Sequence, residues 1–364
     1  MPQPGHPPGE AETVRALRSR DRKRTELLSG PPAADDPRGP GRDTTGPDAQ
    51  KLALLAILGP TGTGKSDLAF QLALRLDGEV VNCDALQVYR GFDAATAKPP
   101  HEDRRRVQHH IVDCVEPERD FNLAEFERLA TESVSEIARR HRVPIVAGGT
   151  GMYLRGLLRG IVASPRRDEV LRARIRAMGA RRGAAALHRW LGRLDPDSAA
   201  RIPTGDVQRL ARAVEFALLD GGKWSERLSA HGTWEDGGER YRTLKVGLTM
   251  DRQRLCERLD ARVDRFFETG LIAEVQGLLD RGVSPQANAF KAIGYREVLS
   301  ALNEGRDADG VRDDVKRNTR RFAKRQMTWF RREPGVVWLD AERGVTDLVE
   351  QVTGLWEVHL GRGE

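Results

Sequence analysis

The chain has 364 residues, of which 39% are hydrophobic and 31% charged, and its formal net charge is +6 at neutral pH. This length suits one large domain with an insertion, or two domains. The basic balance fits an anionic partner such as nucleic acid or a diphosphate about as well as a basic solvated surface. Three scattered cysteines form no disulfide or zinc pattern, and no run of 18 apolar residues occurs. We therefore expect a cytoplasmic protein that neither is secreted nor spans a membrane.

The first half of the chain alternates between strand and helix patterns. Residues 1–50 are rich in Pro, Gly, Asp and Arg and poor in large apolar residues, so we expect a disordered extension. Order begins in 51–162, the first part of an expected catalytic core. Its strands are expected at Leu52–Leu58, Glu79–Asn82, His110–Cys114 and Val143–Ala147, and its helices at Lys65–Leu76 and Leu123–Arg142. This alternation predicts an α/β fold with a parallel sheet flanked by helices.

The pattern changes in 163–235, where Arg-rich helical segments predominate and no strand is evident. We interpret this stretch as an α-helical insertion domain with a basic face. Strand character returns in 236–342, the expected second part of the core with its C-terminal helices, and 343–364 is expected to form a C-terminal helix or tail. The elements expected in this second part are strands at Leu244–Met250 and Val336–Leu339 and helices at Arg252–Glu268, Ile272–Arg281, Tyr295–Glu304 and Val311–Arg331.

A glycine-rich loop joins the first strand to the first helix. It fits the pattern GxxxxGK[ST] at every fixed position and consists of Gly59, Pro60, Thr61, Gly62, Thr63, Gly64, Lys65 and Ser66. Backbone N–H groups of such a loop surround an anion, and the helix N-terminus adds a favourable dipole. Lys65 is expected to reach the outer phosphate and Ser66 to bind Mg²⁺. The pattern leaves open which phosphate compound is held, and ATP is the default.

Two carboxylates follow expected strands on the same side of the sheet. Asp84 comes directly after the second strand, where residues of a parallel sheet face the ligand crevice. A carboxylate there can bind Mg²⁺, cap a turn or act as a general base. Asp113, the next-to-last residue of the third expected strand, could serve an ATPase, whereas the Gly148–Gly151 stretch after the fourth strand has no acid.

The order of several motifs resembles the tRNA dimethylallyltransferase family, also called tRNA isopentenyltransferases. After the P-loop come Asp84-Ala-Leu-Gln87-Val-Tyr89, Thr96-Ala-Lys-Pro99, His109-His110, and Gly148-Gly-Thr-Gly-Met-Tyr153. Four further motifs follow in order: Asp206-Val-Gln-Arg-Leu-Ala-Arg-Ala-Val-Glu215, Arg258-Leu-Asp-Ala-Arg-Val-Asp264, Ile293-Gly-Tyr295 and Lys324-Arg-Gln-Met-Thr-Trp329. The resemblance runs from about Leu54 to Leu339. The two histidines have no third ligand at a metal spacing, so we expect them to be structural.

The resemblance implies transfer of a dimethylallyl group from dimethylallyl diphosphate to the N6 amine of the adenosine 3′-adjacent to the tRNA anticodon (position 37). Asp84 would accept the amine proton, with Thr150 orienting it or holding the leaving group. Arg262, the P-loop and Mg²⁺ would stabilise the diphosphate, and Lys324 and Arg325 would contact phosphates. The protein is expected to act as a monomer on the tRNA anticodon stem–loop. The residues implied in tRNA binding are Asp84, Ala85, Leu86, Gln87, Thr150, Arg172, Gln208, Arg209, Arg212, Lys291, Gly294, Tyr295 and Arg296.

Three departures from the family pattern occur. Ala85 stands where the family usually has Ser, Ala95 where it has Gly, and Pro203-Thr-Gly205 where it has His-Pro-Asn. The rival interpretations are prenylation of a free adenine nucleotide, an ATP-dependent small-molecule kinase, and a non-catalytic RNA-binding module. The last leaves the P-loop and Asp84 unexplained, and the first two have less use for an Arg-rich insertion.

Overall fold

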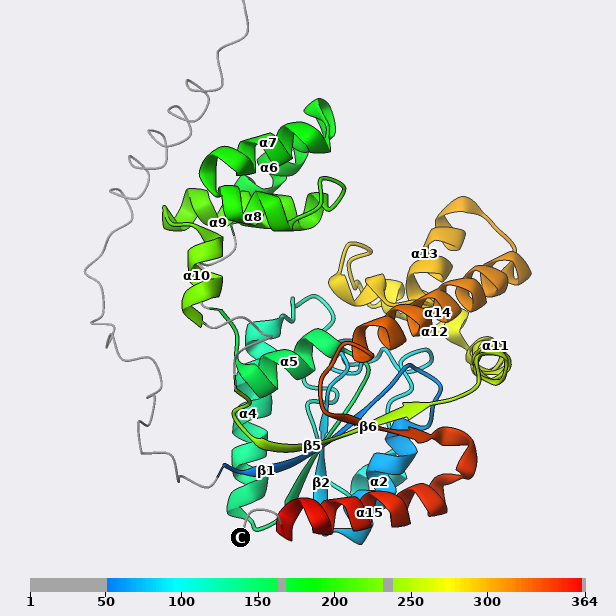
Figure 1. The fold of residues 1–364 in the computed structure, drawn as a ribbon. Helices are drawn as coiled ribbons and strands as arrows, with labels where there is room; N and C mark the ends of the chain where they lie inside the picture. The colour runs from blue at the N-terminus through cyan, green and yellow to red at the C-terminus, as the bar shows by residue number, and fades with distance from the viewer. Residues whose placement is uncertain (1–50, 163–167, 232–237, 362–364) are drawn as a thin grey trace, which may run out of the picture. The chain divides into compact units, whose positions relative to one another are not determined.

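The computed structural model describes residues 51–162, 168–231 and 238–361, so the expected disorder of 1–50 lies outside the described residues. Within them the core is one six-stranded sheet in which every pairing is parallel (Figure 1). The strand order β3-β2-β4-β1-β5-β6 requires crossover connections through helices. The predicted fold class is thereby confirmed. The strands are β1 Ala53–Leu58, β2 Gly78–Asn82, β3 His109–His110, β4 Val143–Ala147, β5 Arg242–Thr249 and β6 Val336–Asp340.

Helices cover both faces of the sheet. Successive β1 side chains point to opposite faces, so Leu55 and Ile57 join one buried cluster while Leu54 and Ala56 join another. The first cluster packs beneath α2 (Lys65–Arg75) and α15 (Val345–Gly361). The second packs beneath α4 (Leu123–Arg139), α5 (Gly151–Arg159) and the helices between β5 and β6. Strands buried on both faces explain why β1 has a continuous apolar sequence.

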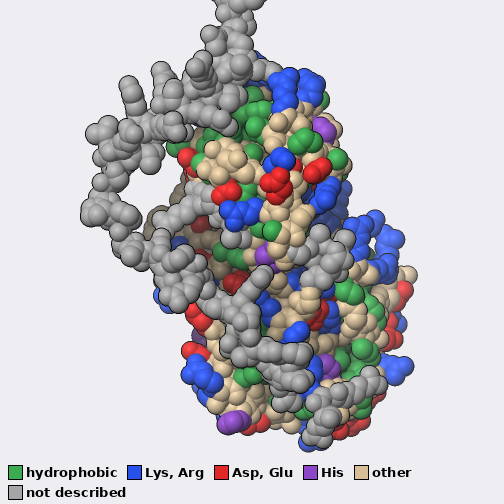
Figure 2. Space-filling view, turned by 60° about the vertical axis from the view of Figure 1, so that its left-hand side comes forward, with side chains coloured by type: hydrophobic (Ala, Val, Ile, Leu, Met, Phe, Trp, Pro, Cys, Tyr) green, Lys and Arg blue, Asp and Glu red, His purple; other side chains and the backbone are tan. Residues whose placement is uncertain are grey.

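The described residues between α5 and β5 form helices joined by short loops, and no strand. They form α6 Glu169–Arg182, α7 Ala184–Leu194, α8 Pro196–Arg201, α9 Val207–Asp220 and α10 Trp224–His231, around an apolar cluster of their own. The buried Asp195 carboxylate accepts hydrogen bonds from the backbone and side chains of Ser198 and Ser225, which ties α10 to α8. Figure 2 shows basic side chains at the upper end of the molecule, where these helices lie. The predicted boundaries of this insertion remain predictions.

Between β5 and β6 the chain forms α11 Arg252–Glu268, α12 Leu271–Asp280, η1 Asn288–Lys291, α13 Tyr295–Glu304 and α14 Ala308–Phe330. The Tyr295 ring is fully buried at the start of α13, with its centroid 4.7 Å from that of Phe92. Its hydroxyl donates to Glu274, whose carboxylate also accepts from the backbone N–H groups of Asp93 and Ala94. The Ile-Gly-Tyr motif therefore anchors the 93–100 loop to the C-terminal helices.

The predicted strand His110–Cys114 is wrong beyond His110. The chain leaves the sheet because Ile111 and Asp113 adopt positive φ angles of 61° and 51°. Ion pairs from Lys98 and Arg104 hold the Asp113 carboxylate in place. The helices α3 (His101–Arg106) and α5 were not anticipated. Among the residues described, no helix is both long and apolar enough to cross a membrane.

Candidate active site

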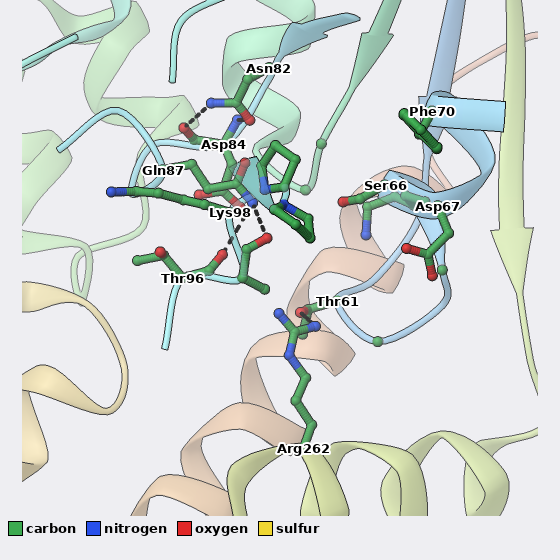
Figure 3. A pocket seen from close by; sticks show the side chains of 18 of the residues that line it. Thr61, Ser66, Asp67, Phe70, Asn82, Asp84, Gln87, Thr96, Lys98 and Arg262 are labelled. Carbon is green, nitrogen blue, oxygen red and sulfur yellow. Dashed lines mark hydrogen bonds between the residues drawn. The ribbon is translucent and has the colours of Figure 1, made fainter. Parts of the chain in front are cut away.

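Three loops meet at one edge of the sheet because their strands are neighbours. The P-loop follows β1, Asp84 follows β2, and Gly148–Gly151 follows β4, which lies between β1 and β2. Carboxyl ends of parallel strands all open on the same edge, so the loops enclose a common pocket of about 380 Å³. Figure 3 shows Thr61 and Ser66 on the P-loop side of it, and Asp84, Gln87 and Thr96 on the other.

The P-loop conformation depends on its glycines. Gly59, Gly62 and Gly64 have φ angles of 137°, 87° and 85°, which residues with a Cβ rarely adopt. A Cβ on Gly59 would also lie 2.6 Å from the Leu248 carbonyl oxygen. The loop opens directly into α2, whose N-cap residue Gly64 makes no side-chain cap. The first N–H groups of that helix are thus offered to an anion.

Positive charge concentrates beside this loop. The Lys65 ammonium donates to the Pro60 carbonyl oxygen at 2.7 Å, and the Arg262 guanidinium extends from α11 to the Thr61 hydroxyl at 3.3 Å (Figure 3). Arg258 and Arg265, one turn on either side of Arg262 in α11, line the same pocket. Burial and the charge of Arg262 lower the pKa of Lys65 to about 7, although Asp84 acts to raise it. Such a concentration of cations suits a polyanionic group.

The turn that carries Asp84 is held by the side chains of Asn82 and Thr150. The Asp84 N–H donates to Asn82 Oδ1 at 3.1 Å, and Asn82 Nδ2 donates to the Ile111 carbonyl at 2.8 Å. The Ala85 N–H donates to Thr150 Oγ1 at 3.2 Å. Burial raises the pKa of the Asp84 carboxyl, while the Leu86 N–H and the charge of Lys65 oppose this rise. The fixed geometry and raised pKa suit a proton acceptor.

Gln326 joins two of these loops from a distant helix. Its Oε1 accepts from the Thr61 N–H at 2.8 Å, and its Nε2 donates to the Gly149 carbonyl at 2.9 Å. The Gly148–Gly149 backbone passes so close to its neighbours that a Cβ on Gly148 would lie 2.1 Å from the Cys83 carbonyl oxygen. Two glycines are therefore a steric requirement of this loop.

The 93–100 loop closes the pocket opposite the P-loop. The Gln87 side-chain amide donates to the carbonyls of Thr96 and Ala97, both at 3.1 Å. The Lys98 side chain, only 4% exposed, pairs with Asp93 and Asp113. Asp113 is thus committed to holding this loop, because it also accepts from Arg104. This pairing argues against the role in ATP hydrolysis that its position in the sequence suggested.

Apart from Asp84, Ala85, Leu86, Gln87 and Thr150, which are half-buried, the predicted tRNA contacts fall into two groups. Gln208, Arg209, Lys291 and Arg296 are exposed. Arg172 and Arg212 instead pair with the fully buried Glu215, and Gly294 and Tyr295 are buried. In this structure the Tyr295 and Arg172 side chains bond to Glu274 and Glu215, and their contact with RNA stays a prediction. For the Arg212–Glu215 pair the available signal was an Arg three residues before an acid on one helix.

Metal binding here would depend on few protein ligands. Among the described residues, no group of three His, Cys, Asp or Glu side chains is placed to hold an ion. His110 is paired with the buried Glu79 at 2.7 Å, in line with a structural role. Ser66, the residue after Lys65, is exposed and lines the pocket. One hydroxyl beside an anion site fits Mg²⁺, which commonly takes its other ligands from phosphates and water.

Several pocket residues were not expected as part of the site. The sequence motifs contain Gln326 and Lys98, but no function was predicted for either residue. None was predicted for Asn82, Arg258 or Arg265, which also line the pocket. The sequence spacing of Arg258 and Arg265 does indicate that they lie beside Arg262. Arg258, Arg262 and Arg265 recur at intervals of four and three residues, which places them on one face of a helix.

The fold and the pocket define a P-loop α/β protein, built to hold a phosphorylated ligand opposite a fixed carboxylate. Comparison with known proteins narrows this class. Residues 87–333 match the family model described as IPP transferase. The chain is 47% identical over 288 residues to the tRNA dimethylallyltransferase of Solibacter usitatus, covering 79% of this chain and 92% of that one. It is 41% identical over 309 residues to that of Geobacter metallireducens, covering 85% and 99%. This chain belongs to the IPP transferase family.

Solved structures agree with that assignment. The full-length tRNA isopentenylpyrophosphate transferase of Bacillus halodurans superposes with a TM-score of 0.63 at 36% identity, covering 85% of this chain and 99% of that one. A eukaryotic dimethylallyltransferase described as acting on tRNA gives a TM-score of 0.70 at 29% identity, covering 80% and 74%.

Proposed function

We propose that this protein transfers a dimethylallyl group from dimethylallyl diphosphate to the exocyclic N6 amine of the adenosine 3′-adjacent to the anticodon (position 37) of a tRNA. The observation that carries the proposal is the Asp84 carboxylate, which lies across one pocket from a P-loop lined with cations. Membership of the IPP transferase family and the names of the relatives support the donor and the acceptor.

The reaction needs both a proton acceptor and a stabilised leaving group. The adenine amine is a weak nucleophile, because its lone pair is delocalised into the ring. As its nitrogen bonds to the allylic carbon, the carbon–oxygen bond to the diphosphate breaks, and Asp84 accepts the amine proton. A general base contributes about 10²- to 10⁴-fold in rate. Thr150 acts here by holding the Ala85 backbone and so the turn that aims Asp84.

The leaving diphosphate carries away the electron pair of the broken bond. The backbone N–H groups of the P-loop, Lys65 and Arg262 stabilise its growing charge. Ser66 would hold Mg²⁺, which would neutralise diphosphate charge when bound. Since the Lys65 ammonium bonds to the Pro60 carbonyl in this structure, it must release that partner to take up the ligand.

The acceptor must bring one base into the pocket. A stacked adenine has to be extruded, at a cost of a few kcal/mol. We propose that Ala85, Leu86 and Gln87 contact that base, beside Asp84. The exposed Gln208, Arg209, Lys291 and Arg296 would contact the anticodon stem–loop, with Arg212 positioned through Glu215. Lys324 and Arg325 would contact phosphates. We further propose that the protein works as a monomer in the cytoplasm, where its substrate occurs.

The test is an acceptor comparison. The protein is mixed with Mg²⁺ and labelled dimethylallyl diphosphate, and with either unmodified tRNA or AMP. Label is expected on the adenine of tRNA alone. Label on AMP would favour the free-nucleotide interpretation, and ATP consumption without any label transfer would favour a kinase.

A further inference from the structure

A second pocket, of about 290 Å³, is formed by α5 and the C-terminal end of α14. It is lined by Arg155, Lys324, Arg325, Thr328, Trp329 and Arg332. Four of these six residues are cationic, and none is acidic. Lys324, Arg325 and Arg332 are exposed, so their charges face solvent.

The residues that wall this pocket are themselves fixed. The Arg155 guanidinium lies over the Trp329 ring, 4.7 Å from its centroid, and pairs with the buried Glu333 at 2.8 Å. Trp329 packs so closely on Gly151 that a Cβ there would lie 2.1 Å from the indole. Arg155 and Trp329 thus form a rigid base, and the three exposed cations supply the free charge.

Both pockets are built on the same stretch of α14. Gln326 contacts Thr61 and Gly149 at the wall of the first pocket, and Trp329, three residues later, packs on Gly151 at the wall of the second. At 1.5 Å of rise per helical residue, Lys324 and Arg325 lie within about 3 Å of Gln326 along the axis of α14, and Arg332 follows two residues after the helix ends. An RNA strand whose target base enters the first pocket can therefore present a neighbouring phosphate to the second.

We propose that this second pocket binds backbone phosphates of the anticodon loop that flank the target adenosine. This inference rests on the proposed function and deepens it. A small free anion is a poorer occupant, because this end of α14 offers carbonyl groups and the negative end of the helix dipole instead of N–H groups. Cations on long exposed side chains suit a phosphate backbone, whose position they follow without reading sequence.

The experiment removes the three exposed charges together in the full-length protein, as Lys324→Gln, Arg325→Gln and Arg332→Gln. We expect tRNA affinity at about 150 mM salt to fall at least tenfold. The slope of log affinity against log salt should become shallower by about 2, since each single-strand phosphate contact contributes about 0.7. The kcat at saturating tRNA and the KM for dimethylallyl diphosphate should stay within about twofold.

The matched control removes three charges elsewhere, as Arg75→Gln, Arg128→Gln and Arg139→Gln. These arginines lie on α2 and α4, outside both pockets, and should leave the salt slope within experimental error. An unchanged slope in the test variant, or an equal change in the control, would overturn the inference while tRNA prenylation by the unsubstituted protein stands. A raised KM for dimethylallyl diphosphate alone would also overturn it, because the pocket would then serve the free donor. Absence of prenylation by the unsubstituted protein would sink the proposed function itself.

Discussion

Gln326 accepts a hydrogen bond from the backbone N–H of Thr61 at 2.8 Å, although the two residues lie 265 positions apart. The bond fastens α14 to the phosphate loop, and the second bond of the same side chain, to Gly149, fastens both to the loop after β4. The shape of the pocket therefore depends on a residue that is remote in sequence from the P-loop.

Gln326→Leu keeps the approximate volume and loses both bonds. It should destabilise the protein by about 1–3 kcal/mol, because it leaves buried partners unsatisfied. It should also raise the KM for dimethylallyl diphosphate about tenfold, since the P-loop loses a support. Urea unfolding and steady-state kinetics measure the two effects. The exposed Gln276→Leu is the control and should change neither, and a Gln326→Leu enzyme with native KM and stability would disprove the bridging role.

The pKa of Lys65, lowered by burial and Arg262 to about 7, makes donor binding depend on pH. A protonated ammonium attracts the diphosphate and a neutral amine does not, so the Kd of dimethylallyl diphosphate should rise up to tenfold per unit above about pH 7. Calorimetric titration from pH 6 to 9 measures this. Lys65→Arg keeps its charge throughout and should show no such rise. Equal pH dependence in both proteins would rule out Lys65 as the titrating group.

The same lowered pKa has a consequence for stability. Between about pH 7 and 10.5 the unfolded chain binds more protons at Lys65 than the folded protein does. Burial of this ammonium therefore lowers the free energy of unfolding by its full amount below pH 7. This destabilisation diminishes as the pH rises toward 10.5. Lys65→Met should be more stable than the native protein at pH 6, and this advantage should shrink by pH 10. A constant difference across that range would contradict the linkage.

Asp113 holds the 93–100 loop through Lys98 and Arg104. Burial acts to raise the pKa of Asp113, but these two hydrogen bonds outweigh it and hold the pKa below its ordinary value. The stabilisation is present above the ordinary carboxyl range near 3.8 and is lost as pH falls below it. Asp113→Asn removes one of the two carboxylates that pair with the buried Lys98 ammonium. It should lower the free energy of unfolding by about 2–3 kcal/mol at pH 7, somewhat less than the loss of one partner from a fully buried ion pair.

The control for Asp113→Asn is Glu132→Gln, which breaks the exposed ion pair with Arg128 on α4. That change should cost less than about 1 kcal/mol. Denaturant unfolding of the two variants at pH 7 makes the comparison. Equal losses would mean that the Lys98–Asp113 pair contributes no more than an ordinary surface pair.

Gly148→Ala tests the close approach of the loops. The new Cβ would lie 2.1 Å from the Cys83 carbonyl oxygen, a backbone atom that must move to make room. Overpacking of this kind lowers the free energy of unfolding by about 1–3 kcal/mol. Movement of the Cys83 backbone would also displace Asp84, the residue after it, so turnover should fall by more than tenfold. Gly205→Ala has no neighbour within 4 Å and should be close to neutral. Native turnover in Gly148→Ala would contradict the steric account.

The sequence predicts most of the sheet and the centre of the pocket. Lys65, Asp84 and Thr150 follow apolar strands, and parallel strands bring their carboxyl ends to one edge, so the pattern alone predicts that they converge. Gln326 was not assigned because its partners are backbone atoms in two distant loops, and Lys98 was not assigned because Asp113 reaches it from beyond β3. No periodicity encodes such contacts. The third strand was overextended because Ile111 and Val112 are apolar, while the positive φ angles that end it depend on tertiary ion pairs.

The central claim is that Asp84 accepts the proton of the attacking amine. Asp84→Asn preserves size and removes the base, so single-turnover transfer of labelled dimethylallyl to tRNA should slow by about 10²- to 10⁴-fold, while the Kd for tRNA stays within about threefold of native. That result, measured on the same preparation by rapid quench and by filter binding, is what the account predicts. A near-native transfer rate in Asp84→Asn would contradict it.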